Sequence, residues 1–384
     1  MENGRILFSE FDSEKIRNEM IRDFEDVVGE TLHPSDERAM FLNNLAQVVI
    51  AISANTNDVG NSCLLRFARG NVLDELGDWW GVERLPAESA ITTLKFTLSA
   101  AQSSDVVIPF GTRATPDGEV YFATTKALTI KAGELSGEVE AKATTAGVAM
   151  NGYIAGQIKY IVDNIQFLKT VENTTASGGG ADQEDDESYR ERIRLSPEAL
   201  STAGTEDGYI FYAKSASGDV GDVVVYSPVN DESLSDEARQ AGAGKVYIYI
   251  LKSDGTIPTE DDAVLTAVKN AVSAKDVRPL TDFVTVLPPT KSEYTINLQY
   301  YISRDNAENE ADIKAAVTQA INEYIDWQDK KIGRDINPDR LKFSMLLAGA
   351  SRVVVNTPIF AEVTTQSVAK HTGEITATFA GYSE

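Results

Sequence analysis

The chain is 384 residues long, with 59 acidic residues against 35 Lys and Arg, and its formal net charge is −24. Such an acidic chain lacks the basic surface that neutralises phosphates, which excludes nucleic acid as its main partner and argues against an anionic membrane. The length suggests two or three domains, and 42% apolar with 24% charged residues is ordinary for a folded soluble protein.

The sequence gives no sign of export or membrane insertion. Its N-terminus has no basic stretch followed by an apolar core, so it does not resemble a signal peptide. The most apolar window, residues 45–54, is far shorter than a membrane span. We therefore expect synthesis in a cytoplasm. The single Cys63 cannot form an internal disulfide, and its place in a helical pattern suggests a small buried side chain.

Residues 1–88 are predicted to form a helical region. Ile16, Met20 and Phe24 follow helical spacing in the first helix. The second helix, which follows Pro34, spreads its apolar residues too widely for a helix with one solvated side. We therefore predict a bundle with helices of other chains, with partner-binding residues Ile16, Met20, Phe24, Phe41, Leu45, Val49 and Ile52. A third helix over 61–69 should end at Gly70 and a fourth, over 72–80, at Gly81.

The hydrophobic period changes to two at about residue 92, which predicts an all-β module over residues 89–172. Short alternating segments are separated by Pro- and Gly-containing turns, a pattern typical of a β-sandwich or a barrel-like domain. The segments lie at residues 94–98, 106–108, 120–122, 128–130 and 139–143.

A mixed half follows the Gly-rich stretch Gly178, Gly179 and Gly180, which we interpret as a linker and hinge, with a second break at Ala203–Gly204. Helices and strands then alternate, which predicts a central α+β domain over 173–290 and a C-terminal α+β domain over 291–384. The expected fold class is α+β multidomain: an N-terminal helical region, a β-sandwich-like module and a mixed α+β C-terminal half.

Two motifs suggest chemistry, but their spacing does not fit. The acidic run 182–187 lacks the Gly and Glu that a calcium loop needs, and fits better a helix that Asp182 caps and an Asp186–Arg190 pair supports. The run 242–245 lacks the first Gly and the Ser or Thr of a phosphate loop, and Lys245 opens a predicted strand. We expect no metal site and no cofactor.

No catalytic constellation stands out either. His33 and His371 are the only imidazoles, and neither is near a nucleophile motif. The pair Trp79 and Trp80 is either an aromatic platform for a ligand or, as we favour, an anchor where the helical region meets the β module. We expect a protein that is not an enzyme.

Four groups of short motifs follow one another along the chain, between roughly residues 60 and 300. They are residues 67–77 with 81–87, 108–112 with 117–124, 178–193 with 203–209 and 220–225, and 278–282 with 286–289. Each motif is weak alone, and beyond 300 no motif contributes. In this order they together resemble the baseplate J-like family, the wedge proteins of contractile-tailed phages and related injection systems.

The resemblance implies a structural role in a virion or injection-particle baseplate that is assembled in the bacterial host cytoplasm. Members form wedges around the hub and spike, pair with a second copy and with a tail protein I-like wedge partner, and contact the lysozyme-like sheath-initiating wedge protein. Rearrangement of the baseplate then triggers sheath contraction. The family has no catalytic residues to carry over. The alternative function is a tail-associated receptor or carbohydrate-binding protein that uses the β module.

Overall fold

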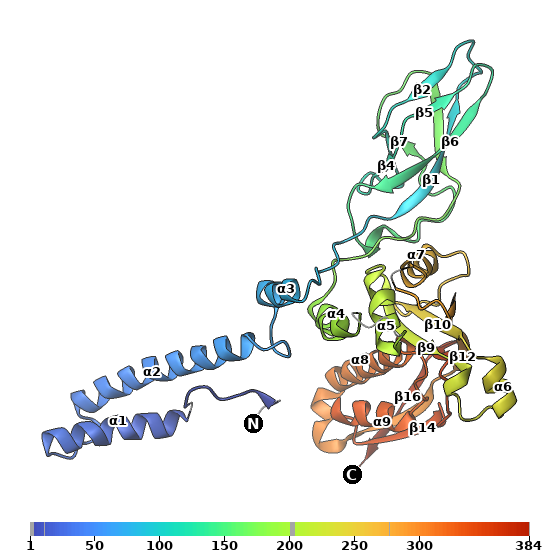
Figure 1. Ribbon diagram of the computed structural model, residues 1–384. Coiled ribbons are helices and arrows are strands. Elements are labelled where there is room, and N and C mark those ends of the chain that lie inside the picture. The colour runs from blue at the N-terminus through green and yellow to red at the C-terminus, as the bar shows by residue number, and fades with distance from the viewer. Residues whose placement is uncertain (1–3, 11, 200–203, 276, 384) are drawn as a thin grey trace. The chain divides into compact units, whose positions relative to one another are not determined.

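The computed structural model describes residues 4–10, 12–199, 204–275 and 277–383 and has the predicted α+β multidomain class (Figure 1). The chain divides into two compact units. The first unit holds residues 1–84 and 185–193, and the second holds 85–184 and 194–384. Residues 185–193, which we expected in the central domain, therefore pack with the N-terminal helices.

The first unit is built on the antiparallel pair α1 (Ser13–Val28) and α2 (Glu37–Ser62). Asp12 and Asp36 cap the two helices, and Gly29 ends α1 with a φ of +75°. The predicted third helix over 61–69 is wrong: α2 continues through Ser62, turns follow, and Gly70 opens α3 (Gly70–Trp79). Gly81, with a φ of +69°, closes the turn after α3.

The β module in the second unit is a six-stranded sheet in the order β7-β3-β4-β6-β1-β8, with the pair β2-β5 beside it. β1 alternates buried and partly exposed residues, and Leu94, Phe96 and Phe122 lie at the centre of the core. The edge strands β7 and β8 approach each other, so the sheet curls towards a barrel. The strands are β1 (Ile91–Leu98), β2 (Val106–Ile108), β3 (Arg113–Thr115), β4 (Phe122–Thr124), β5 (Leu128–Ile130), β6 (Ser136–Ala143), β7 (Tyr160–Ile161) and β8 (Leu168–Asn173).

The segments that enter and leave the β module are paired with each other. Glu88 and Ala181 exchange backbone hydrogen bonds of 2.8 and 3.0 Å, and Ile91 and Gly178 exchange bonds of 2.8 and 3.1 Å. The module is therefore an insertion carried on a two-stranded stem.

The central domain is a three-stranded sheet with β10 between β9 and β11. β9 (Val220–Tyr226) pairs antiparallel and β11 (Phe283–Leu287) parallel with β10 (Lys245–Lys252), which begins at Lys245 as predicted. Ile248 and Ile250 pack against α5 (Glu206–Ser215) and α7 (Ala263–Val272). α4 (Asp186–Ala199) precedes this domain, and a short helix that we did not predict, α6 (Asp236–Ala241), lies before β10.

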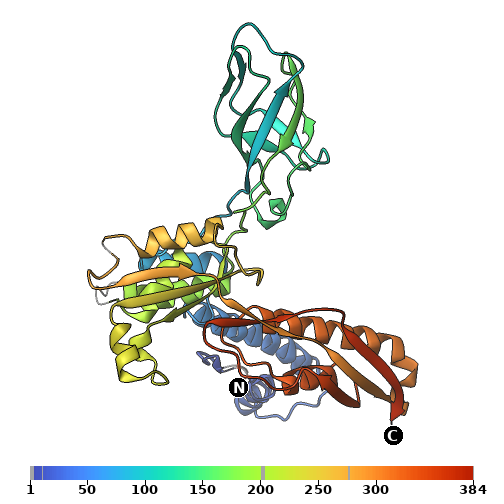
Figure 2. The ribbon, with the colours of Figure 1, turned by 90° about the vertical axis from the view of Figure 1, so that its right-hand side faces the viewer.

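The C-terminal domain packs α8 (Glu310–Asp329) and α9 (Pro338–Leu347) on the sheet β14-β13-β16 (Figure 2). A second pair, β12-β15, is parallel. The predicted strand over 293–302 is two strands, and β15 was not predicted. The strands are β12 (Thr290–Tyr294), β13 (Asn297–Ser303), β14 (Arg352–Thr357), β15 (Ser367–His371) and β16 (Thr376–Ser383).

The central and C-terminal domains share a core. Tyr249 and Leu251 on the second face of β10 pack with Ile332 and Val368. The buried carboxylate of Asp222 accepts hydrogen bonds from the Lys331 Nζ at 2.7 Å and the Ile332 backbone N–H at 2.8 Å. Because a buried carboxylate is costly without such partners, these bonds fix the two domains to each other.

Candidate interaction interface

The exposed face of α2 is unusually apolar. Residues 39–57 contain no charged side chain. Phe41 is 67% exposed and Ile52 is 61% exposed, and Leu45 and Val49 are also exposed. Four exposed apolar residues, Phe41, Leu45, Val48 and Ile52, repeat at steps of four, three and four, which is the spacing of a coiled-coil seam. Val59 extends this seam seven residues after Ile52, with the polar Asn55 at the position between them.

The opposite face of α2 is covered within the chain. Ala39, Leu42 and Leu32 are buried where Phe24 of α1 packs against them. Ile16 is only 9% exposed and Met20 is partly buried. Of the seven sequence-predicted partner residues, the four on α2 are therefore accessible, whereas the three on α1 lie at least partly buried in their own chain.

An N-terminal segment, residues 5–9, packs against the C-terminal part of α2. The side-chain amide of Asn57 accepts from the backbone N–H groups of Phe8 and Ser9 at 2.7 and 2.9 Å and donates to the Ser9 carbonyl. The Asn61 amide pairs in the same way with the N–H and carbonyl of Ile6, at 2.9 and 2.8 Å. A side chain at Gly60 would overlap the Phe8 ring, so the helix approaches the segment closely there. Two asparagines one turn apart thus hold an extended segment.

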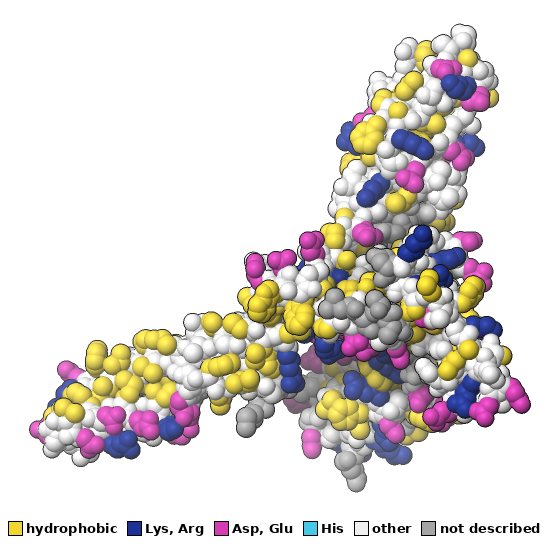
Figure 3. All heavy atoms as spheres, viewed as in Figure 1, with side chains coloured by type: hydrophobic (Ala, Val, Ile, Leu, Met, Phe, Trp, Pro, Cys, Tyr) yellow, Lys and Arg dark blue, Asp and Glu magenta, His cyan; other side chains and the backbone are white. Residues whose placement is uncertain are grey.

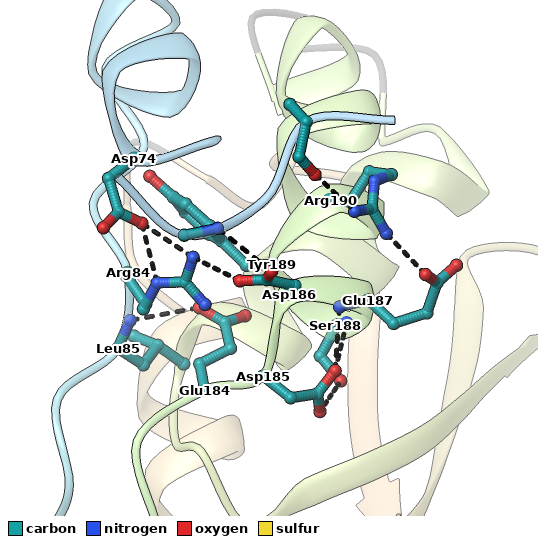
Figure 4. Close-up of polar contacts among 12 residues, drawn as sticks. Asp74, Arg84, Leu85, Glu184, Asp185, Asp186, Glu187, Ser188, Tyr189 and Arg190 are labelled. Carbon is teal, nitrogen blue, oxygen red and sulfur yellow. Dashed lines mark hydrogen bonds and ion pairs between the residues drawn. The ribbon is translucent and has the colours of Figure 1, made fainter. Parts of the chain in front are cut away.

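The first unit is closed by a group of polar contacts that we call the Arg84 cluster, formed by Asp74, Arg84, Asp186 and Tyr189 (Figure 4). The Arg84 guanidinium donates to Asp74 at 2.7 Å and to Asp186 at 2.8 Å, and its carbon lies 4.6 Å from the centre of the Tyr189 ring. It therefore ties α3 to the start of α4.

Asp186 also caps a helix far away in the sequence. Its carboxylate accepts from the Gly70 N–H at 3.1 Å, at the N-terminus of α3, where Arg69 gives no side-chain cap. The Gly70 N–H, and then Arg84, hold the pKa of Asp186 below its usual range. Arg190 adds bonds of 2.8 and 2.7 Å to the carbonyls of Leu65 and Ala68.

The cap of α4 differs from the sequence prediction. Asp185, and not Asp182, accepts from the N–H groups of Glu187 and Ser188 at 2.8 and 3.0 Å (Figure 4). Burial acts to raise the pKa of Asp185, but the bonds from Ser188 and Glu187 lower it overall. Asp182 instead accepts from the Val148 N–H. The expected Asp186–Arg190 pair is replaced by Asp186 with Arg84 and Arg190 with Glu187.

The glycines that we expected in an open linker are held in place. Gly178 is bonded to Ile91, and Gly180 is buried, donating to and accepting from the Asn151 side chain at 2.8 and 2.7 Å. A Cβ at Gly180 would lie 2.6 Å from the Gly147 carbonyl oxygen. The open-linker expectation is wrong here, because the stem pairs these residues with a segment about 90 positions earlier. Gly179 has a φ of +78° and free space around it.

Gly204, in the stretch 203–209, packs against the stretch 278–282. Its φ is +71°, and a Cβ there would lie 2.7 Å from Pro279 and 2.8 Å from the Asp282 carboxylate. The same carboxylate accepts from the Tyr209 hydroxyl at 2.8 Å, and burial followed by this bond raises the pKa of Tyr209. Gly204 is therefore a packed position; Ala203 lies outside the described residues.

The remaining candidates from the sequence are two exposed tryptophans, an exposed cysteine and a histidine that packs against a tyrosine. Trp79 and Trp80 are exposed. Cys63 is exposed and not buried as expected. His371 sits against the Tyr294 ring at 5.7 Å, and its backbone N–H donates to Asp329.

Within the described ranges, no group of three or more His, Cys, Asp or Glu side chains is arranged to hold a metal ion. In the same residues, no helix combines the length and the apolar character that crossing a bilayer requires.

Comparisons with known families give consistent matches along the chain. A baseplate J-like protein barrel domain matches residues 93–180, a baseplate J-like central domain matches 201–288, and a baseplate J-like protein C-terminal domain matches 296–378.

Two curated relatives and a solved structure are similar to this chain. Baseplate protein J of Escherichia phage P2 is 31% identical over 192 residues, which is 50% of this chain and 58% of the relative. The uncharacterized protein YqbT of Bacillus subtilis (strain 168) is 28% identical over 239 residues, 60% of this chain and 59% of the relative. The chain thus spans less than two thirds of either relative. A chain of the anti-feeding prophage baseplate, with 12% identity and a TM-score of 0.43, aligns over 93% of this chain and 90% of its own length.

Proposed function

Because this chain belongs to the baseplate J-like family, we propose that it is a structural, non-enzymatic component of the baseplate of a contractile tail or injection particle. Within the baseplate it acts as a wedge protein around the central hub and spike. This role places it in the finished particle, after assembly in the bacterial host cytoplasm. The three family domains that match in order along residues 93–378 support this proposal.

The observation that carries the proposal is the exposed apolar face of α2. In a lone chain the seam from Phe41 to Val59 stays in water, and a contiguous exposed apolar surface of this kind marks an interaction site. The exposed residues also include Met40 and Val49, which flank the seam on either side. This width fits more than one additional helix, and a heteromeric bundle supplies them.

The partners we propose follow from the family. They are a second copy of this chain, a tail protein I-like wedge partner, the lysozyme-like sheath-initiating wedge protein and the hub or spike. The N-terminal helices enter the bundle, whereas the mixed half, with its central and C-terminal domains joined by Asp222 and the shared core, makes contacts around the ring. Rearrangement of these contacts transmits the signal that releases sheath contraction. Within the glycine segment the proposed pivot is Gly179, which has free space around it, whereas Gly178, Gly180 and Gly204 are paired or packed.

The experiment tests whether the chain captures a co-expressed tail protein I-like partner. Leu45→Glu and Ile52→Glu place charges on the exposed seam and leave the buried α1–α2 contacts intact. We expect these variants to fold but to lose the co-purifying partner, since a charge in the centre of an apolar interface is costly to desolvate. Point substitutions are preferable to deleting residues 1–85, because the deletion would uncover Tyr189, which is 1% exposed.

The matched control is Val107→Glu, on a similarly exposed apolar residue of the β module. It should leave capture unchanged. Undiminished capture by both α2 variants would overturn the bundle, and an isolated monomer that turns over a substrate would overturn the structural role altogether.

A further inference from the structure

The C-terminal end of α3 carries a second exposed surface that the α2 face does not include. Trp79 is 88% exposed and Trp80 is 56% exposed, and Val72 on the same helix is also exposed. Figure 3 shows hydrophobic side chains next to acidic ones over this helix. Tryptophan is a large side chain with a strong tendency to be buried or to serve at an interface, so a pair in water requires an explanation.

The helix that presents these rings is rigidly held. Asp74 is bonded to Arg84, the N-terminus of α3 is capped by Asp186, and Gly77 packs so closely on Tyr189 that any side chain there would overlap its hydroxyl. A ring presented on such a fixed helix loses little conformational freedom when it binds, which favours its use as an anchor.

The charge around the two rings is negative. Glu75, Asp78 and Glu83 are exposed, and none of them forms an ion pair with a residue in the described part of the chain. The C-terminus of a helix also carries the negative end of its dipole, and α3 ends at Trp79. A cation placed here meets unpaired carboxylates, the helix end and aromatic faces together.

The third tryptophan, Trp327, differs from Trp79 and Trp80 because basic side chains lie over its ring. The Trp327 ring has the Arg334 guanidinium 3.9 Å and the Arg340 guanidinium 5.2 Å from its centre. Among the described residues, no arginine or lysine lies over the ring of Trp79 or Trp80. A cation that stacks on Trp79 or Trp80 would therefore be supplied by another molecule.

We propose that the end of α3 around Trp79, Trp80, Glu75 and Asp78 is a docking site for an arginine- or lysine-bearing segment of a partner protein. The basic side chain stacks on an indole face while the carboxylates neutralise it, and its apolar neighbours cover Val72. Neutral carbohydrate also stacks on tryptophan and can donate hydroxyl hydrogen bonds to carboxylates, but it brings no positive charge to balance these acids and the helix end. This site does not depend on the α2 seam, so it can fail or hold independently of the proposed function.

The test uses the full chain and an immobilised short peptide of alternating arginine, leucine and glycine. The same peptide with citrulline in place of arginine keeps the shape and removes the charge. We expect binding to the arginine peptide, a blue shift in tryptophan emission, and about fivefold or greater weakening with citrulline, with Trp79→Ala or with Glu75→Gln/Asp78→Asn. Higher salt should weaken binding, because exposed charges are screened.

The matched control is Glu260→Gln/Asp261→Asn, which removes the same charge from two exposed acids just before α7 and should bind like the unchanged chain. Circular dichroism should show that Trp79→Ala is folded, because the residue is exposed. Equal binding of the citrulline peptide, or equal weakening by the control variant, would overturn the proposal. So would binding of a neutral oligosaccharide in preference to the arginine peptide, or no binding at all.

Discussion

The Tyr189 hydroxyl donates a 2.6 Å hydrogen bond to the carbonyl oxygen of Val82, a residue 107 positions earlier in the chain. The ring lies over Gly77, where a Cβ would overlap the hydroxyl and lie 2.8 Å from the same carbonyl. This contact joins α4 to the loop after α3 and needs a residue without a side chain at its centre.

Gly77→Ala should therefore destabilise the first unit by about 1–3 kcal/mol, the usual cost of overpacking a buried contact. Tyr189→Phe should cost about 1 kcal/mol, because it leaves the Val82 carbonyl without its partner. Chemical denaturation followed by circular dichroism measures both. Asn71→Ala, an exposed change on the same helix, is the control, and a Gly77→Ala protein as stable as that control would contradict the close contact.

The lowered pKa of Asp186 predicts that the free energy of unfolding depends on pH. Because its folded pKa lies below the ordinary value of 3.8, its ionised form stabilises the fold above that value, and the contribution is lost as the pH falls through the folded pKa. Asp186→Asn should be less stable than the unchanged chain at pH 7, and the difference should vanish in strong acid. Urea titrations at a series of pH values test this. Equal stability of Asp186→Asn and the unchanged chain at pH 7 would contradict it.

The two asparagines on α2 make separable predictions for hydrogen exchange. Asn57→Ala should speed exchange of the Phe8 and Ser9 amides, while Asn61→Ala should speed that of Ile6, since each amide donates to one asparagine. Residue-resolved exchange by NMR distinguishes these patterns. If either variant released all three amides together, the segment would be held as one unit, and the two asparagines would not act individually.

The stem glycines differ in the space around them. Gly180→Ala places a Cβ 2.6 Å from the Gly147 carbonyl oxygen and should lower the thermal stability of the β module, whereas Gly178→Ala meets nothing within 4 Å. The expected cost for Gly180 is about 1–3 kcal/mol and for Gly178 less than about 0.5 kcal/mol. Differential scanning calorimetry compares them, and equal melting would show that the stem does not hold Gly180 tightly.

The sequence predicted most of the helices and strands whose hydrophobic residues repeat with a regular period. Strands such as β1 and β10 alternate or run apolar over several residues, and helices such as α5 have a Thr205 cap that can be recognised. It missed β3 and β7, which are three and two residues long and carry no period, and α6, a single turn and a half in a polar stretch.

The interface could be predicted only in part. An over-hydrophobic helix is visible in the composition of residues 39–57, but which of its neighbours cover it depends on how α1 folds back, so Ile16 and Phe24 could not be separated from Phe41 and Ile52. The Arg84 cluster joins Arg84 to Asp186, about a hundred positions later, and a single arginine between Glu83 and Leu85 gives no local signal of that partner. Likewise, three glycines are typical of a linker, and their pairing with residues 88–91 depends on tertiary structure.

The two-stranded stem brings the two ends of the β module close together, so the module can be replaced as a unit. The Leu85 N–H reaches the Glu184 carboxylate at 3.0 Å, so the chain departs and returns at neighbouring points. A foreign domain whose ends are one strand spacing apart, about 5 Å, could replace the whole insert without rerouting the backbone on either side. The geometry makes residues 91–178 a self-contained insert that can be exchanged while the two strands of the stem stay paired.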